Sequence, residues 1–164
     1  MSSNHVRVAA AAAVIGLIAG IVVTLTAQTA GPAARSAPGR QVIRPARAPN
    51  TGLPLSPGIL VGDTLYVAGT TGRDPATAKL VGGGIEAETR QALTNIEEVL
   101  KAAGMSLANV ATVTVYISSF DDFARFNAVY TTYFPKDPPA RATVQVVRLN
   151  DGARIELQMI AVRR

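Results

Sequence analysis

The sequence predicts an α+β domain over residues 58–164, in which a single mixed β-sheet carries two helices on one face. Apolar residues recur at helical spacing in two segments. Before, between and after these segments, runs rich in β-branched and aromatic residues are bounded by glycine, proline and aspartate turn signals. The expected order is strand, strand, helix, strand, helix, strand, strand. Two amphipathic helices are enough to cover one face of such a sheet.

The first half of the domain is expected to open with a hairpin and continue into a helix. The runs Gly58–Val61 and Thr64–Ala68 flank a Gly-Asp pair, which favours a tight turn between two strands. After a glycine-rich loop, apolar residues at helical spacing predict a helix over 86–103. Gly104 follows it, at the position where a glycine commonly ends a helix.

The second half is expected to add a strand, a helix and two more strands. Ala111–Ser118 is alternating and rich in β-branched residues, which is typical of a strand. A Ser-x-x-Asp pair resembles a capping box and opens a predicted helix over 119–134. Ala142–Val147 and Arg154–Val162 are expected to be strands, and the Asp-Gly pair between them is a hairpin signal.

This pattern leaves one sheet face uncovered. In the last strand, Leu157 and Met159 alternate with a second set that ends in Ile160 and Val162, so both faces are partly apolar. Burial against other copies of the chain is the simplest way to cover the second face, and we expect a homo-oligomer.

The N-terminal part predicts a membrane segment and a spacer. Val8–Ala27 is twenty residues long without a charge, about 30 Å as a helix, which matches a bilayer core. A signal peptide has a shorter apolar region and a small-x-small cleavage site, which is poorly formed in this sequence. Residues 1–27 are therefore expected to be a membrane anchor, with export after cleavage as the alternative and the side of the membrane open. Residues 28–57, rich in proline, alanine and arginine, show no periodic pattern and predict an extended linker.

Charge and composition exclude several kinds of function. The net charge of +5 comes from five arginines before residue 51, whereas residues 51–164 hold 11 basic and 11 acidic residues. This balance disfavours nucleic-acid binding. The chain has no cysteine, and its one histidine, His5, precedes the apolar segment. A thiol nucleophile, a metal site and a serine–histidine hydrolase are therefore not expected.

Several stretches in a fixed order resemble the RidA-type (YjgF) family of imine deaminases, over nearly all of residues 53–164. The stretches are Val61–Gly69, Ile85–Asn95, Asp122–Tyr130, Pro139–Val144 and Arg154–Ala161. The resemblance implies a chorismate-mutase-like fold and a homotrimer with active sites in the clefts between subunits. It also implies hydrolysis of reactive 2-imino or enamine acids, small-molecule substrates, to 2-oxo acids and ammonia, without metal or organic cofactor.

The resemblance also directs attention to particular side chains. Arg141 is expected to hold the substrate carboxylate through two parallel hydrogen bonds. Glu156 is expected to position water and move protons, although a structural ion pair with an arginine is the competing interpretation. Asn127 matches a family asparagine in the same cleft, and Thr143 shares a strand face with Arg141.

The sequence departs from the family pattern at one wall of the expected pocket. Leu55 replaces a family tyrosine, Ala68 a serine and Thr70 a glutamine. Loss of these polar groups predicts a more apolar pocket and a bulkier apolar imino acid as substrate. The alternative is a non-catalytic trimer of the same fold that binds a small ligand or a protein. The joint presence of Arg141 and Glu156 favours the enzyme.

Overall fold

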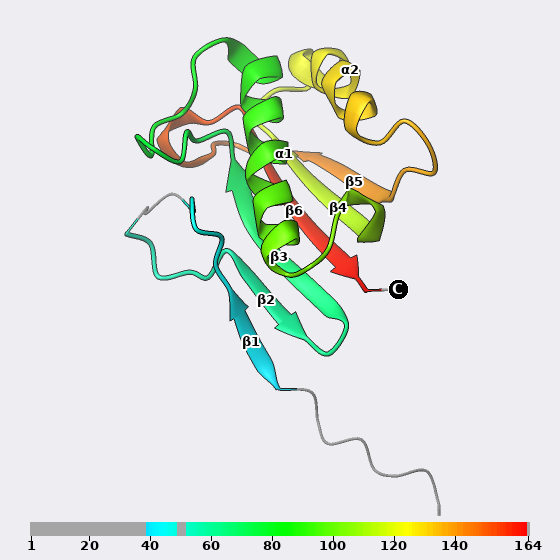
Figure 1. The fold of residues 1–164 in the computed structure, drawn as a ribbon. Coiled ribbons are helices and arrows are strands. Elements are labelled where there is room, and N and C mark those ends of the chain that lie inside the picture. The colour runs from blue at the N-terminus through cyan, green and yellow to red at the C-terminus, as the bar shows by residue number, and fades with distance from the viewer. Residues whose placement is uncertain (1–38, 49–51, 164) are drawn as a thin grey trace, which may run out of the picture. The chain divides into compact units, whose positions relative to one another are not determined.

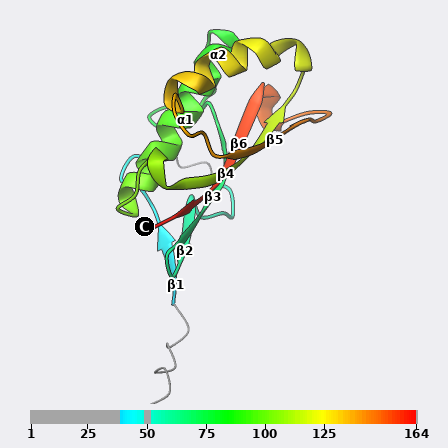
Figure 2. The same ribbon diagram turned by 90° about the vertical axis from the view of Figure 1, so that its right-hand side faces the viewer.

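The computed structural model describes residues 39–48 and 52–163, which form a six-stranded mixed sheet and two helices (Figure 1). The strands follow the order β1-β2-β3-β6-β4-β5 across the sheet. They are β1 Arg40–Ile43, β2 Gly58–Val61, β3 Thr64–Thr71, β4 Val110–Ile117, β5 Ala140–Gln145 and β6 Ile155–Val162. The helices are α1 Gly84–Ala102 and α2 Phe123–Tyr133, and both lie on the same face of the sheet (Figure 2). The predicted α+β fold class is confirmed.

Strand β1 lies inside the segment that the sequence predicts to be a linker without strands. It pairs antiparallel with β2, from Arg40 opposite Val61 to Ile43 opposite Gly58, and Ile43 is buried. The expectation of no strand is therefore wrong for these four residues. Only Val42 and Ile43 are apolar among them, a run too short to stand out against the surrounding arginines and prolines.

The predicted hairpin between the last two strands is also wrong. Strand β6 inserts between β3 and β4 and is antiparallel to both, whereas β5 pairs parallel to β4 at the sheet edge. The residues of β6 that face the helices are almost completely buried, which suits a central strand. Most of β5 is exposed, which suits an edge. The Asp-Gly pair instead belongs to a short turn at Asn150–Gly152, with Asp151 at a φ of 53°.

The hydrophobic core lies between the sheet and the two helices. Helix α1 contributes Ile85, Leu93, Ile96 and Leu100, and α2 contributes Phe126, all fully buried. The facing strand residues include Leu65, Val67, Val113, Val115, Leu157 and Met159. Each such side chain stabilises the fold by about 1.5–3 kcal/mol relative to exposure.

The opposite face of the sheet is open within the described chain and remains partly apolar. Tyr66 on β3 is 49% exposed, Val144 on β5 is 44% exposed and Val162 on β6 is 39% exposed. Strand register places all three on the face away from the helices, together with Ile160. The uncovered apolar face that the pattern predicts is thus present, and the oligomer that would cover it stays a prediction.

The expectation of a membrane-anchored protein needs correction. Within 39–48 and 52–163, neither helix has the length and apolar character needed to cross a bilayer. The segment Val8–Ala27, on which the expectation was built, lies outside the described residues. The expectation of a membrane-anchored protein is therefore withdrawn, because no helix of the described residues supports it.

A buried carboxylate fastens α1 to the start of β6. Glu88 is 5% exposed, and its Oε2 accepts a hydrogen bond of 2.8 Å from the backbone N–H of Arg154. Burial raises the pKa of Glu88 above its usual 4.5, although the Arg154 backbone bond and positive charge oppose this shift. Close by, the buried carboxylate of Asp122 pairs with the guanidinium groups of Arg154 and Arg125.

Glu88→Gln is expected to raise the unfolding temperature at neutral pH by a few degrees. The folded state holds the Glu88 proton to higher pH than the unfolded state does. The stability linked to this proton is therefore present below pH 4.5 and lost as pH rises through the folded pKa. The side-chain oxygen of a glutamine can still accept the hydrogen bond from the backbone N–H of Arg154, and the neutral amide carries no charge that has to be buried. Thermal unfolding between about pH 5 and pH 8 measures the effect.

The matched control is Glu97→Gln, the same chemical change at a half-buried position of the same helix. It should leave the pH dependence of unfolding as in the wild type. A lower unfolding temperature for Glu88→Gln at neutral pH would mean that the attraction between Glu88 and Arg154 outweighs the cost of burying the charge.

Candidate functional site

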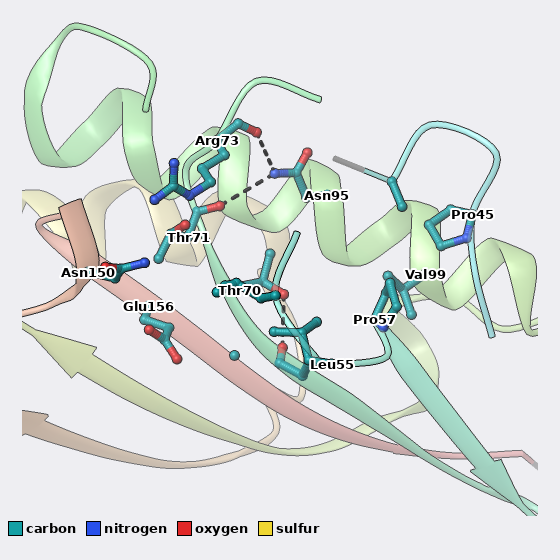
Figure 3. A pocket seen from close by; sticks show the side chains of 14 residues that line it. Pro45, Leu55, Pro57, Thr70, Thr71, Arg73, Asn95, Val99, Asn150 and Glu156 are labelled. Atoms are coloured by element: carbon teal, nitrogen blue, oxygen red, sulfur yellow. Dashed lines mark hydrogen bonds between the residues drawn. The ribbon is translucent and has the colours of Figure 1, made fainter. Parts of the chain in front are cut away.

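A cavity of about 240 Å³ opens at the end of β3, and its lining divides into a polar and an apolar end (Figure 3). The polar end is formed by Thr70, Thr71, Arg73, Asn95, Asn150 and Glu156. The apolar end is formed by Pro45, Leu55, Pro57 and Val99. Ala48 and Leu53 also line the cavity, and backbone hydrogen bonds join them to Pro45 and Leu55. The segment between β1 and β2, the end of β3 with the loop after it, helix α1, the turn at Asn150–Gly152 and strand β6 all contribute, so the fold brings together residues far apart in sequence.

Glu156 supplies the carboxylate of this cavity. It lies on β6 between Ile155 and Leu157, which point into the core, so its side chain points to the opposite face. Across the ladders it pairs with Thr71 of β3 and Tyr116 of β4. Among residues 39–48 and 52–163, Glu156 has no salt-bridge partner. The competing interpretation of a structural ion pair is therefore not supported.

Gly69 makes room for this carboxylate. The register between β3 and β6 shifts between Val67 and Thr70, and Gly69 lies in that irregular stretch. A Cβ atom built at Gly69 would lie only 1.9 Å from Oε1 of Glu156. The carboxylate thus packs directly on the glycine backbone, and any side chain at residue 69 would displace it. In the sequence, Gly69 ends the family-like stretch Val61–Gly69, but nothing in that stretch indicates this role.

The polar end is held in shape by hydrogen bonds from α1. Asn95 donates from Nδ2 to the carbonyl oxygens of Arg73 at 2.8 Å and Thr71 at 3.4 Å (Figure 3). Arg73 pairs with Asp151 and also donates to the carbonyl oxygen of Ala78. These residues were not singled out from the sequence. The polar residue Asn95, within an otherwise apolar helical stripe, is the one signal that could have pointed to them.

Arg141 belongs to a second group of residues, on α2 and β5. Its Nη1 donates to Oδ1 of Asn127 at 2.8 Å. Its guanidinium carbon lies 5.8 Å from the ring centre of Phe123, 5.4 Å from that of Phe126 and 4.7 Å from that of Tyr130. Distances below about 6 Å give favourable cation–π contacts. Arg141 is exposed and has no salt-bridge partner in the described ranges.

Tyr130 completes this aromatic shelf, defined as the rings of Phe123, Phe126 and Tyr130. Tyr130 is 3% exposed, and its hydroxyl oxygen has no hydrogen-bond partner among the described residues. Burial raises the pKa of Tyr130 to about 12, with the positive charge of Arg141 acting in the opposite direction. The hydroxyl therefore stays protonated, and the ring offers a neutral π face to the guanidinium.

The two groups do not meet within one chain. Leu55, Ala68 and Glu156 all line the cavity, whereas Arg141 and Asn127 meet at the aromatic shelf. Thr143 lies on β5 two residues after Arg141, on the same strand face. That face belongs to the helix side, since Arg141 pairs with the core residue Val113. Glu156 points to the other side of the sheet, so the predicted site residues form two separate halves.

The described residues hold no group of three or more His, Cys, Asp or Glu side chains placed to bind a metal ion. What each half offers is simpler. One presents a carboxylate without an ion-pair partner among the described residues, beside a cavity with an apolar end, and the other presents a guanidinium that likewise has none there and is backed by aromatic rings. The first suits proton transfer to and from a bound molecule, and the second suits capture of a carboxylate.

Comparison with known proteins identifies relatives along most of the chain. The family model described as Endoribonuclease L-PSP matches residues 45–163. The 2-iminobutanoate/2-iminopropanoate deaminase of Bos taurus is 46% identical over 124 residues, covering 76% of this chain and 90% of that protein. The protein of the same name from Homo sapiens is 43% identical over 124 residues, with the same coverage.

Solved structures agree with the sequence comparison. RidA from an Antarctic Psychrobacter species superposes with a TM-score of 0.72 at 35% identity, covering 75% of this chain and 99% of that one. The structure of E. coli TdcF with bound serine gives a TM-score of 0.72 at 31% identity, covering 76% and 99%. The chain therefore belongs to the Endoribonuclease L-PSP family, the family of the RidA-type (YjgF) proteins.

Proposed function

We propose that this chain is an imine deaminase, which hydrolyses 2-imino acids and their enamine tautomers to 2-oxo acids and ammonia. The observation that carries the proposal is its 43–46% identity to proteins named 2-iminobutanoate/2-iminopropanoate deaminase, over 90% of their length. The unpaired carboxylate of Glu156 in the cavity and the unpaired guanidinium of Arg141 support it, because the reaction needs one group for proton transfer and another for the substrate carboxylate.

The proposed chemistry requires only water. As Glu156 takes one of its protons, the water oxygen bonds to the carbon of the C=N group. The π electrons move to nitrogen, which accepts a proton to form a tetrahedral carbinolamine. The hydroxyl proton is then transferred through Glu156 to the amino nitrogen, the C–N bond breaks with its electron pair leaving on ammonia, and the oxygen forms the C=O bond of the 2-oxo acid. Glu156 moves protons in both steps, and its position at the polar end orients the attacking water.

The proposed active site is shared between copies of the chain. Arg141 and Glu156 point to opposite faces of one sheet, so a substrate that contacts both must lie between two copies. The exposed apolar residues on the open face of the sheet, Tyr66, Val144 and Val162, support such an assembly, and we propose a homotrimer. Asn127, Thr143 and the aromatic shelf then complete the half that holds the carboxylate. The structure of E. coli TdcF holds bound serine, a ligand that bears a carboxylate, and this supports the arrangement.

Gly69→Ala is expected to lower kcat by about 10- to 100-fold with a smaller change in KM. The new Cβ would lie only 1.9 Å from Oε1 of Glu156, so the carboxylate must rotate out of place. Steady-state kinetics with a generated imine measure the loss. In a Glu156→Ala background, the same Gly69→Ala change should cost nothing further, since no carboxylate remains to be displaced. Full activity of the single variant would rule out this role for Gly69.

A coupled assay tests the proposed function. An amino-acid oxidase generates the imine, and release of the 2-oxo acid is followed with and without the protein. Acceleration over spontaneous hydrolysis supports the deaminase, and loss of the acceleration in Glu156→Gln assigns it to this site. A lack of acceleration across several amino acids would instead favour a non-catalytic binder of the same fold.

The description of the matching family also names an endoribonuclease. Ribonuclease activity is not favoured for this chain, because residues 51–164 carry 11 basic and 11 acidic residues and the one histidine is His5. Incubation of the same preparation with single-stranded RNA is a direct control, and we expect no cleavage that depends on Glu156.

A further inference from the structure

The cavity beside Glu156 continues well past the reacting centre of any small imine. From the carboxylate it runs between Thr70 and Leu55 toward Pro57 and Val99 (Figure 3). The hydroxyl of Thr70 donates to the carbonyl oxygen of Ala68 at 2.9 Å, so it is already engaged by the backbone. Beyond Thr70 the lining is apolar. A group entering from Glu156 therefore meets a surface that hydrocarbon fits better than a polar chain does.

The size of the cavity exceeds what a methyl or ethyl side chain fills. Its volume is about 240 Å³. An engineered apolar cavity of about 150 Å³ in another protein binds benzene, and a water molecule occupies about 30 Å³. The relatives named above carry 2-iminobutanoate and 2-iminopropanoate in their names, substrates with an ethyl and a methyl side chain. Either would leave most of this cavity unfilled.

Charge at the polar end argues against a charged substrate side chain. Arg73 is the one cation among the described residues of the lining, and it is already paired with Asp151 and hydrogen-bonded to the carbonyl oxygen of Ala78. Glu156 would repel a second acidic group. At the apolar end, Leu53 and Leu55 are 49% and 44% exposed, two leucines that a bound apolar group would cover.

We propose that this site is specific for 2-imino acids with a bulky apolar side chain, of the branched aliphatic or phenylalanine-like class. The inference rests on the proposed deaminase function. The imine carbon lies at Glu156, and the carboxylate points out of the cavity toward Arg141 of an adjoining copy. The side chain extends along Leu55 to the surface formed by Ala48, Pro57 and Val99. Each additional side-chain carbon that is buried in the cavity adds apolar contact, which lowers the activation free energy for the larger substrate and raises its kcat/KM.

The test compares kcat/KM for imines generated from leucine and from alanine by the same oxidase. The wild type is expected to prefer the leucine imine by at least about 10-fold. Ala48→Leu narrows the apolar end without touching Glu156 and should lower this preference by about 10-fold. The matched control is Ala46→Leu, the same substitution two residues away at an exposed position outside the cavity lining, which should keep the wild-type ratio.

The possible results distinguish the inferred substrate preference from the proposed deaminase function on which it rests. A preference for leucine that falls in Ala48→Leu but not in Ala46→Leu supports the inference. Turnover of both imines with an equal or greater kcat/KM for alanine overturns the inference and leaves the deaminase standing. A preference that is unchanged in Ala48→Leu also overturns it, because the selectivity then arises elsewhere. No acceleration of either imine overturns the proposed function and the inference together.

Discussion

Replacing Arg141 with alanine is expected to lower kcat/KM for 2-imino acids by about 100-fold, with a large part of the loss in KM. The guanidinium is exposed, unpaired with any described carboxylate and oriented by the 2.8 Å hydrogen bond to Asn127. Its guanidinium carbon lies within 6 Å of all three ring centres of the aromatic shelf, and the N–H groups other than the one bonded to Asn127 are available to a ligand. Alanine removes both the charge and the paired hydrogen bonds that fix a carboxylate.

Arg141→Lys separates charge from geometry. A lysine ammonium keeps the charge but lacks the planar fork and the stacking surface, so it should recover only part of the lost kcat/KM. Arg148→Ala is the control, since this arginine is also exposed but lies outside both halves of the site. The coupled assay reports KM and kcat separately, and thermal unfolding shows whether each variant is folded. An unchanged KM in Arg141→Ala would remove the arginine from substrate binding.

Local pattern was enough to predict most of the elements, because each segment carries its own periodicity. The stripe from Ile85 to Leu100 predicts α1, and the alternation of Ile155, Leu157 and Met159 predicts β6 with Glu156 on the other face. What local pattern did not provide is the partner of each strand. The Asp-Gly pair before β6 fits a hairpin with β5. Strand β6 pairs instead with β3 and β4, in the middle of the sheet, where its helix-facing side chains are buried.

The sequence supplied polar and charged residues for the candidate site, whose roles stay predictions, but it could not predict what surrounds them. Arg141, Asn127 and Glu156 came from a resemblance over motifs, and the structure accounts for the orientation of each. Gly69 could not be recognised, because it is the carboxylate of Glu156, 87 positions away in the sequence, that leaves no room for a Cβ atom there. The aromatic shelf likewise looked like an ordinary core stripe of α2. Only the three-dimensional structure places Arg141 above it.

Mixing two inactive variants is expected to restore activity. Arg141→Ala keeps Glu156, and Glu156→Gln keeps Arg141, so each pure assembly lacks one half of every site. Glu156→Gln alone should lower kcat by about 100- to 10,000-fold, the usual range for removing a proton-transfer group. If a site takes Arg141 from one copy and Glu156 from its neighbour, random co-assembly makes about a quarter of all sites complete.

The experiment unfolds the two variants together and refolds them as a mixture, so that copies exchange. Activity near a quarter of the wild type is the expected result, against the low activity of each variant refolded alone. Folded variants combined without exchange should stay at that low level. If Arg141 and Glu156 instead served one site within a single copy, no mixture of the two could contain a complete site. The opposite directions of these side chains on one sheet make that arrangement geometrically unfavourable, so recovered activity would be a direct readout of a site built between copies.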